Sequence, residues 1–368
     1  MIFMELYRTK ISDIDPSSPI RTVRLKDGRT IRKVVDKSII KRGRKSDIRS
    51  YVQIFLLTIT LWIGIDFYLF VSGLEKGVVT YRPPGVEGFL PISSLMSLRY
   101  YLLTGVLSHV HPAGFFILVA AIMVSMLMKK GFCSWICPVG FISESMHQLG
   151  NKIFGRSFRL PRFLDVALRP VKYLLLAFFL VTISMLSVSQ LGQFLNSDYN
   201  KVADIKLYFF FVHISDFSLT VIGILIVLSV LYENFWCRYA CPYGALLGLT
   251  SLFSPMKVRR IEESCIDCGK CAEVCPSLLP VDKLDQVNSA ECTGCYSCVE
   301  ACPIRDTLKF SVSSGSKGLS QRRYGILMLA LFFGIIGLAM ISGFWTTSIT
   351  GREYLYLFRK IGALGHSF

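Results

Sequence analysis

Residues 265–276 and 292–303 read CIDCGKCAEVCP and CTGCYSCVEACP, so one twelve-residue pattern occurs twice in close succession. Both stretches have the spacing C-x2-C-x2-C-x3-C-P. Cysteine thiolates at this spacing hold iron–sulfur clusters, because three thiols on a tight loop can cover one side of a 4Fe–4S cubane. The fourth thiolate must come from elsewhere, and Pro276 and Pro303 turn the chain away after each stretch. The two stretches therefore predict a module that binds two 4Fe–4S clusters.

The fourth cysteine of such a stretch ligates the other cluster in two-cluster ferredoxins. The first cluster is therefore predicted to take three thiols from the first stretch and one from the second: Cys265, Cys268, Cys271 and Cys302. The second cluster is predicted to take the remaining four: Cys292, Cys295, Cys298 and Cys275. Paired C-x2-C motifs also bind tetrahedral Zn²⁺, but eight cysteines in a tandem run favour iron–sulfur clusters.

The composition predicts a membrane protein rather than a soluble one. The chain of 368 residues is 52% hydrophobic, with a mean hydropathy of +0.50 and several long apolar runs. Its twelve cysteines all fall into four motifs, the two above and a C-x3-C-P motif at Cys133/Cys137 and again at Cys237/Cys241. No cysteine is left for a disulfide, as expected for thiols kept reduced on the cytoplasmic side of a membrane.

The basic N-terminus predicts the orientation of the chain. The net charge is +16, and residues 1–50 carry 14 Lys and Arg against 6 Asp and Glu. A basic segment directly before an apolar run indicates a cytoplasmic N-terminus lying on anionic lipid, and this interpretation is favoured over nucleic-acid binding. The alternation of RTVRLKDGRTIRK around Asp27 and Gly28 predicts a small β-hairpin. A polar, basic start also predicts no cleavable signal peptide.

The expected fold class is an α-helical polytopic membrane protein, with about five transmembrane helices and an inserted α+β ferredoxin-like module. The five predicted spans are 51–72, 109–128, 171–190, 211–232 and 324–346. A shorter apolar stretch, 93–106, is expected to lie in the interface or re-enter. With the N-terminus inside, the module lies inside and the C-terminal tail outside. The expected domains are a basic segment (1–50), a four-helix membrane domain (51–256), the module (257–310), and a linker, fifth helix and tail (311–368).

An internal repeat joins the two C-x3-C-P motifs. An offset of 104 residues carries Cys133 to Cys237, Cys137 to Cys241 and His109 to His213. Two parallel two-helix repeats would bring all four cysteines together at the cytoplasmic rim and both histidines together at the outer rim. Prolines after Cys137 and Cys241 predict that these thiols lie at helix N-termini. The four cysteines are a candidate third iron–sulfur site, with two redox-active dithiols or inert buried cysteines as the alternatives.

Three residues are candidates for quinol binding or proton transfer: Asp66, His109 and His213. An acid inside a span is expensive and often functional, although an ion pair of Asp66 with Arg82 or Arg99 is an equal alternative. The two histidines, with His111, are candidates for haem ligation, for proton transfer from quinol, or for a plain position at the interface.

The motifs FCSWICPVG, WCRYACPYG and the tandem ferredoxin run together resemble the NapH/MauN-type membrane ferredoxins. The likeness covers about residues 50–310 and extends to the membrane and ferredoxin half of NosR, and more distantly to CcoG/FixG proteins. NosR has an external flavin-binding domain and CcoG an external β-sandwich, and neither is expected in this chain. The resemblance implies a carrier in the bacterial inner membrane that relays electrons between the quinone pool and redox subunits of cytochrome or ferredoxin type.

The leading hypothesis is an iron–sulfur electron-transfer protein, in one form the quinol dehydrogenase membrane component of a larger complex. The first alternative is an assembly factor that reduces a metal or a thiol for another redox enzyme. The second is a redox sensor that signals by losing a cluster. The sequence contains neither a GxGxxG fingerprint nor a P-loop, so nucleotide-dependent chemistry is not expected.

Overall fold

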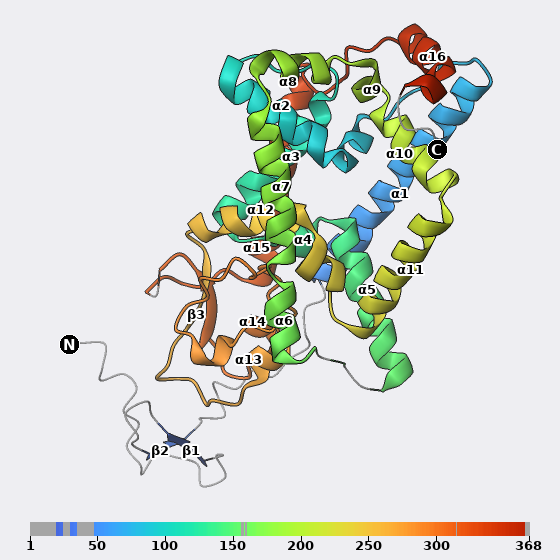
Figure 1. The fold of residues 1–368 in the computed structure, drawn as a ribbon. Coiled ribbons are helices and arrows are strands. Elements are labelled where there is room, and N and C mark those ends of the chain that lie inside the picture. The colour runs from blue at the N-terminus through green and yellow to red at the C-terminus, as the bar shows by residue number, and fades with distance from the viewer. Residues whose placement is uncertain are drawn as a thin grey trace.

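The computed structural model describes residues 48–155, 158, 160–313 and 315–364, except the side chain of residue 162, and the backbone of 20–24 and 30–34. Within these residues the fold is mostly helical, with two small antiparallel sheets. Figure 1 shows a helical bundle with the ferredoxin-like module and the strands β1 and β2 at one end. The helices α2, α8, α9 and α16 lie at the opposite end, near the C-terminus.

Three helices among the described residues are long and apolar enough to cross a membrane. They are α1 (Ile48–Glu75), the nearly continuous pair α6 (Arg162–Leu168) and α7 (Val171–Met185), and α15 (Gln321–Ile341). The helices α10 (Ala203–Val212) and α11 (Asp216–Leu231) are bent by 82° at their junction and make a fourth span if counted together. The protein is therefore a membrane protein with three to four candidate spans.

About five spans are predicted from the sequence, whereas the described residues contain three to four candidates, because local breaks divide the apolar runs. The predicted span 109–128 is the 17-residue helix α3 (Pro112–Met128), which begins only at the proline and is shorter than the about 20 residues of a typical span. The predicted span 211–232 is broken at His213, and Ser215 caps the new helix α11 through its side chain. The predicted span 171–190 ends at Met185, and a capping box starts another helix two residues later.

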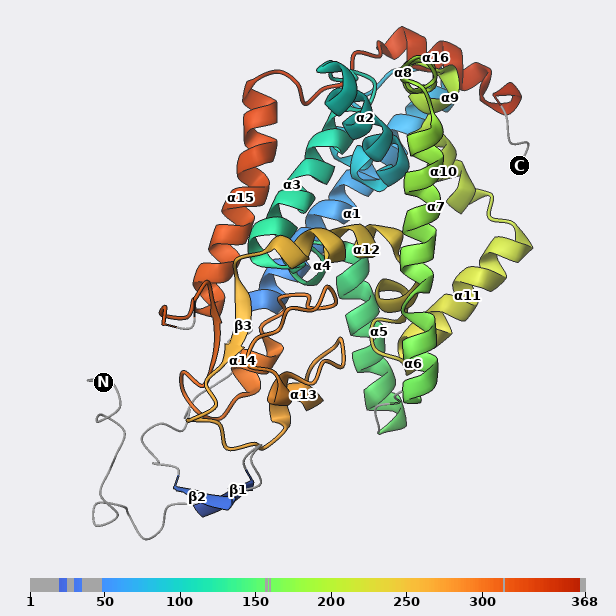
Figure 2. The ribbon, with the colours of Figure 1, turned by 60° about the vertical axis from the view of Figure 1, so that its left-hand side comes forward.

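Short helices close the end of the bundle that lies opposite the module (Figure 2). They are η3 (Pro84–Phe89, 3₁₀), α2 (Pro91–Thr104), α8 (Val188–Leu195), α9 (Asp198–Lys201), α16 (Gly351–Arg359) and η7 (Ile361–Ala363, 3₁₀). The 14-residue α2 corresponds to the predicted short stretch 93–106 and packs on α3 and α8. Tyr354 of α16 packs edge-on against Phe70 of α1, so the C-terminal tail is part of this cap.

The two halves of the repeat exchange helices at the module end. The first C-x3-C-P motif forms α4 (Gly131–Trp135) and α5 (Pro138–Phe154). The second forms a π-helical turn, η4 (Trp236–Ala240), then α12 (Pro242–Thr250) and the 3₁₀ turn η5 (Ser251–Phe253). Helix α5 packs on α11 of the other half, and α12 packs on α3 and α7. This exchange brings both cysteine motifs to the centre of the bundle.

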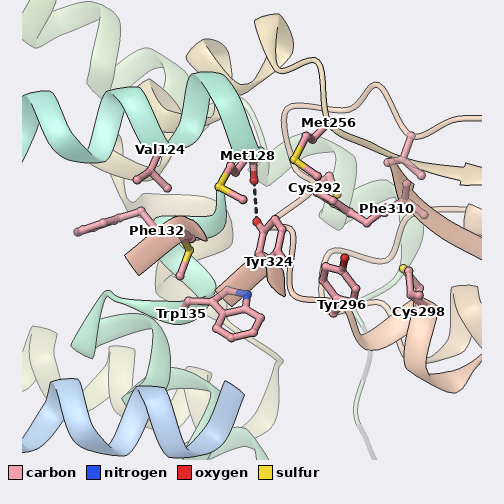
Figure 3. Packing of buried hydrophobic residues seen from close by; sticks show 14 of the residues in the cluster. Val124, Met128, Phe132, Trp135, Met256, Cys292, Tyr296, Cys298, Phe310 and Tyr324 are labelled. Atoms are coloured by element: carbon pink, nitrogen blue, oxygen red, sulfur yellow. Dashed lines mark hydrogen bonds between the residues drawn. The ribbon is translucent and has the colours of Figure 1, made fainter. Parts of the chain in front are cut away.

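The module is built on the antiparallel strands β3 (Lys257–Arg260) and β4 (Leu308–Ser311), with two short helices and a 3₁₀ turn between them: α13 (Lys270–Glu273), α14 (Ser297–Ala301) and η6 (Val281–Lys283). Tyr324 of α15 packs against Trp135, Tyr296 and Phe310 and donates a hydrogen bond to the carbonyl oxygen of Met128 at 2.6 Å (Figure 3). The module and the membrane helices therefore share one hydrophobic core.

Near the N-terminus, β1 (Ile20–Arg24) pairs antiparallel with β2 (Thr30–Val34), with Arg24 opposite Thr30. The strands of the predicted hairpin are thus present. Its turn at Asp27 and Gly28, like most of the basic segment 1–50, lies outside the described residues.

Candidate functional site

The structure gathers the eight cysteines of the module around two small cavities. Three thiols of the first stretch and the last thiol of the second surround one cavity: Cys265, Cys268, Cys271 and Cys302. The other four surround the second cavity: Cys275, Cys292, Cys295 and Cys298. Each group is the set that the spacing predicts for one cluster. Ligation itself stays a prediction.

Left-handed backbone at matching positions of the two stretches makes these loops tight. Gly269 (φ 71°) and Tyr296 (φ 69°) each precede the short helix that carries the third cysteine of its stretch. This conformation favours glycine, so Tyr296 adopts it at a cost. The Tyr296 side chain is anchored by a 2.7 Å hydrogen bond from its hydroxyl to the carbonyl oxygen of Leu319 and by packing on Phe310. Core packing therefore holds the loop shape that glycine provides in the first stretch.

The chemical properties of the eight module thiols fit the binding of iron–sulfur clusters. Burial raises the pKa of the Cys271 thiol to about 11 and that of Cys275 to about 12, so both stay protonated at neutral pH unless a metal displaces the proton. Within the described part of the chain, no group of three His, Cys, Asp or Glu side chains is placed to hold a single metal ion. In a cubane each thiolate binds a different iron atom, so the four thiols of a set need not converge on one point.

The second cysteine set lines one cavity of about 510 Å³. All four thiols take part: Cys133, Cys137, Cys237 and Cys241. Helices α5 and α12 begin at the prolines after Cys137 and Cys241, as predicted, and the backbone N–H of Gly244 donates to Cys241 Sγ at 3.3 Å. Burial raises the pKa of Cys133 to about 12 and of Cys137 to about 11, and the neighbouring Cys241 contributes to both. The predicted convergence of the two motifs is therefore present.

Buried lysines lie at this second set and at the adjacent module cavity. Lys129, Lys130 and Lys172 are 0%, 3% and 0% exposed, whereas the only carboxylate paired with any of them in the described residues is Glu291, 2.5 Å from Lys172 Nζ. The Lys129 ammonium is buried without a hydrogen-bond partner. Three cations around one carboxylate leave an excess of buried positive charge, which is costly without an anionic group. Anionic tetrathiolate clusters fit this environment better than neutral thiols.

The module docks against the second set through three hydrogen bonds to one loop. Ser134 Oγ donates to the carbonyl of Thr293 at 2.6 Å, and Trp135 Nε1 donates to that of Gly294 at 3.2 Å. Arg49 of α1 donates to the carbonyl of Cys295 at 3.3 Å. Cys295 also lines both the second module cavity and the 510 Å³ cavity. The two cysteine sites are therefore direct neighbours.

The large cavity extends from the four cysteines along the membrane helices. Its apolar lining comes from α1, α3 and α15, and includes Ile59, Ile63, Ile117, Phe333 and Ile336. It reaches the η3 segment at the other end of the bundle.

Close to the thiols, Arg49 pairs with Glu144, whose carboxylate also accepts from Gln53 at 3.4 Å. Arg49 and Glu144 line the cavity. Sequence reasoning missed them because they lie 95 residues apart in the chain, and neither belongs to a motif.

The predicted quinol or proton residues do not gather at this cavity. Asp66 is half-buried on α1, and its alternative partners are occupied elsewhere, since Arg82 pairs with Glu87 and Asp204 and Arg99 donates to carbonyl oxygens. None of the three predicted residues lines the cavity.

The two histidines of the repeat contact different aromatic side chains. His109 is exposed and stacks on Phe344, whereas His213 is exposed and stacks on Phe209. No hydrogen bond or ring contact joins the two among the described residues. The expected meeting of the two histidines therefore stays a prediction, and their ring contacts are with different aromatic partners.

A buried ion network instead occupies the end of the bundle opposite the module. Arg82 donates to Asp204 at 2.7 Å and to Glu87 at 2.8 Å, and His111 Nδ1 lies 3.5 Å from the same Glu87. His111 Nε2 lies 2.6 Å from the carbonyl oxygen of Asn200. The sequence leaves the role of His111 undecided. In the structure His111 belongs to a network that connects η3, α3 and α10.

Comparison with known proteins also points to 4Fe–4S clusters at both cysteine sites. A family model described as a 4Fe-4S binding domain matches residues 110–157 and 217–260, which contain both C-x3-C-P motifs. A second, described as a 4Fe-4S dicluster domain, matches residues 257–303. YccM of Escherichia coli, named for a role in electron transport, is 45% identical over 326 residues, covering 86% of this chain and 91% of YccM.

More distant relatives have the same type of name. The methylamine utilization ferredoxin-type protein MauN of Methylorubrum extorquens is 28% identical, covering 66% of this chain and 78% of MauN. The ferredoxin-type protein NapH of Escherichia coli is 26% identical, covering 50% and 63% of the two chains. No solved structure matches the chain significantly.

Proposed function

The chain belongs to the family of ferredoxin-type 4Fe–4S membrane proteins that includes YccM, MauN and NapH, and from that premise we propose that it oxidises quinol and passes the electrons to redox partners through three clusters. The eight module cysteines would hold two 4Fe–4S clusters in the sets given above. A third cluster would be held by Cys133, Cys137, Cys237 and Cys241. Each bound cluster supplies one-electron chemistry, which a two-electron donor such as quinol requires in separate steps.

The observation that carries the quinol proposal is the shape and lining of the 510 Å³ cavity. Its apolar length between α1, α3 and α15 suits an isoprenoid tail, and its inner end is lined by the four thiols. Ligand sites of this kind are mostly apolar with a few placed polar groups. Here those groups are the Arg49–Glu144 pair and Lys130. A quinol ring at this end would lie beside the proposed third cluster.

Glu144 is the proposed proton acceptor, in place of Asp66, His109 and His213. Its carboxylate is held by Arg49 and Gln53 but remains 24% exposed in its side chain. A carboxylate that lines the cavity can accept the proton of a quinol hydroxyl, while Arg49 holds it in place. Replacing Glu144 by Gln should lower the quinol oxidation rate about 10²- to 10⁴-fold, the range for loss of a general base. Iron content should not change.

The alternatives to electron transfer gain no support from the geometry. An assembly factor that handles metal should present spare ligands, but His109 and His213 stack on aromatic rings and His111 is engaged with Asn200 and Glu87. No described contact favours a cluster-loss sensor. Electron transfer therefore remains the proposal, with the quinone pool as donor and a cytochrome- or ferredoxin-type subunit as acceptor.

The decisive experiment uses the full chain, purified anaerobically and reconstituted in liposomes with a reduced quinone analogue. Iron and sulfide are measured per protein, and the clusters are followed by EPR during quinol oxidation. The proposal expects about twelve iron atoms, four for each 4Fe–4S cluster, and cluster reduction by quinol. Clusters that quinol fails to reduce would remove the quinol role and leave the iron–sulfur assignment standing.

The third cluster is tested separately with Cys133→Ser, Cys237→Ser and the double variant. Because ligands of one site act as a unit, each single variant should lose the iron of that site and the double should lose little more. Losses that add, or an iron count of about eight already in the wild type, would favour two separate dithiols.

We place the N-terminus and the module in the cytoplasm of a bacterium, with the chain in the inner membrane. The module and the strands β1 and β2 lie at one end of the bundle and α16 at the other, which supports placing the module and the C-terminal tail on opposite sides of the membrane (Figure 1). A membrane-impermeant thiol reagent applied to intact spheroplasts should not label a cysteine placed at Ser313, which is exposed on the module side. Labelling there would reverse the orientation.

A further inference from the structure

The pair Lys129–Lys130 ends the apolar helix α3, where a sequence interpretation treats the two residues as markers of the cytoplasmic side. Such markers lie in water or among lipid headgroups. In the structure both side chains are buried, with 0% and 3% exposure. The two lysines also lie at different cysteine cavities. Their burial needs an explanation other than topology.

Lys129 belongs to the second cavity of the module. Its ammonium group interacts electrostatically with Cys292, and it has no hydrogen-bond partner. Its backbone has φ of 59°, a left-handed conformation that disfavours a non-glycine residue. That conformation is held by a 3.0 Å hydrogen bond from the Lys129 N–H to Ser254 Oγ. A strained backbone and an unpartnered buried cation at one residue indicate a specific role for the charge.

Lys130 belongs to the four-cysteine cavity. It lines that cavity, and its charge acts on Cys133 and Cys237. Its Nζ lies 3.6 Å from the point where a Cβ atom on Gly244 would stand, beside the N–H that bonds Cys241 Sγ. Lys130 also acts on Cys292, but less strongly than Lys129 does, so each of the two consecutive lysines acts mainly on one of two neighbouring cysteine sites.

The first module cavity has a different electrostatic environment. Its nearest buried cation is Arg260, which faces Asp267 at 3.6 Å and Asp285 at 3.4 Å. Two carboxylates lie within ion-pair distance of that guanidinium, whereas Lys129 has none in the described residues and Lys130 shares the carboxylate of Glu291 with Lys172. At the two sites next to the lysine pair, the buried lysines therefore outnumber the carboxylates that interact with them.

We propose that Lys129 and Lys130 raise the reduction potentials of two adjacent clusters, Lys129 that of the Cys292 cluster and Lys130 that of the four-cysteine cluster. The inference rests on the proposed function, since it requires the clusters to be bound. When a tetrathiolate 4Fe–4S cluster gains one electron from quinol or dithionite, its total charge changes from 2− to 3−. A fixed ammonium in a low-dielectric site stabilises the more negative state. Electrons would then reside at the junction of the membrane domain and the module.

The test uses the full chain with all clusters bound. Lys129→Met and Lys130→Met are titrated with dithionite and followed by EPR at each potential. Lys129→Met should shift the Cys292 cluster to a lower potential and leave the other two unchanged. Lys130→Met should shift the four-cysteine cluster and, to a smaller extent, the Cys292 cluster, on which it also acts. The matched variants Lys129→Arg and Lys130→Arg retain the charge and should keep wild-type potentials.

Unchanged potentials in both Met variants, with all iron retained, would overturn the inference while leaving the proposed function intact. Missing clusters in the wild type would instead overturn the proposed function. If a Met variant fails to assemble its cluster, the neutral polar variants Lys129→Gln and Lys130→Gln decide. A lowered potential in these variants supports the charge effect, and a wild-type potential contradicts it.

Discussion

Gly140 offers the sharpest test of the four-cysteine site, because its counterpart in the repeat provides a matched control. Gly140 is the third residue of α5, directly after Cys137 and Pro138. A Cβ atom at Gly140 would approach the carbonyl oxygen of Cys133 to well under the 3.0 Å that Cβ atoms keep from other atoms. The equivalent Cβ at Gly244 would lie 3.4 Å from the carbonyl of Cys237, an ordinary contact.

The size of the effect expected for Gly140→Ala depends on the type of atom that its new Cβ must displace. The carbonyl of Cys133 belongs to the backbone, so no side-chain rotation relieves the clash, and Gly140→Ala must push α5 away from the Cys133 loop. Overpacking of this kind costs about 1–3 kcal/mol. Displacing the support of a ligand typically lowers metal affinity about 10- to 100-fold. Gly140→Ala should therefore lose about four of about twelve iron atoms, and Gly244→Ala should keep all of them.

The assay is iron and sulfide per protein after anaerobic purification, with EPR to identify which signal is lost. The two module clusters serve as the internal control, since neither glycine lines their cavities. Full iron content in Gly140→Ala, or equal losses in the two alanine variants, would refute the close approach as the reason for glycine at this position.

Two further predictions concern stability, measured by thermal and denaturant unfolding in detergent. Arg82→Met leaves Glu87 and Asp204 buried without their cation and should destabilise the fold by about 3–5 kcal/mol, so a loss below about 1 kcal/mol would show that the network is dispensable. Gly150→Ala drives a Cβ atom into a backbone carbonyl of α11 and should cost about 1–3 kcal/mol. Gly223→Ala is the control, because a Cβ atom there would meet nothing within 4 Å. It should leave stability unchanged or raise it by up to about 1 kcal/mol. Similar effects of the two substitutions would contradict the packing of α5 on α11.

The cysteine sets are the part of the molecule that sequence reasoning predicts best. The grouping of Cys275 with the second stretch and Cys302 with the first follows from local spacing alone, and the two module cavities have these groupings. The offset of 104 residues likewise predicts that the two C-x3-C-P motifs meet, because each motif is followed by a proline that starts a helix. The spacing of the cysteines and the prolines that follow them determine these groupings, so they can be predicted from one sequence.

Features that depend on tertiary contacts were not accessible in this way. The apolar run through His213 gives no sign of an 82° bend, which a capping serine and a short helix produce. Glu144 and Asp204 find their arginine partners 95 and 122 residues away, so neither stands out in the sequence. Asp66 did stand out, yet it does not line the 510 Å³ cavity.

The distribution of buried charge connects these observations. At the module end, the carboxylate of Glu291 interacts with two buried lysines, Lys172 and Lys130, and a third, Lys129, lies beside Cys292. At the opposite end of the bundle, the guanidinium of Arg82 lies between two buried carboxylates, with His111 beside one of them. The first arrangement favours added negative charge, as a bound cluster that has gained an electron would supply. Under the proposed function that electron comes from quinol, whose proton passes to Glu144 in the same cavity. The 510 Å³ cavity extends from the four cysteines to the η3 segment that carries Glu87, so it joins the two ends.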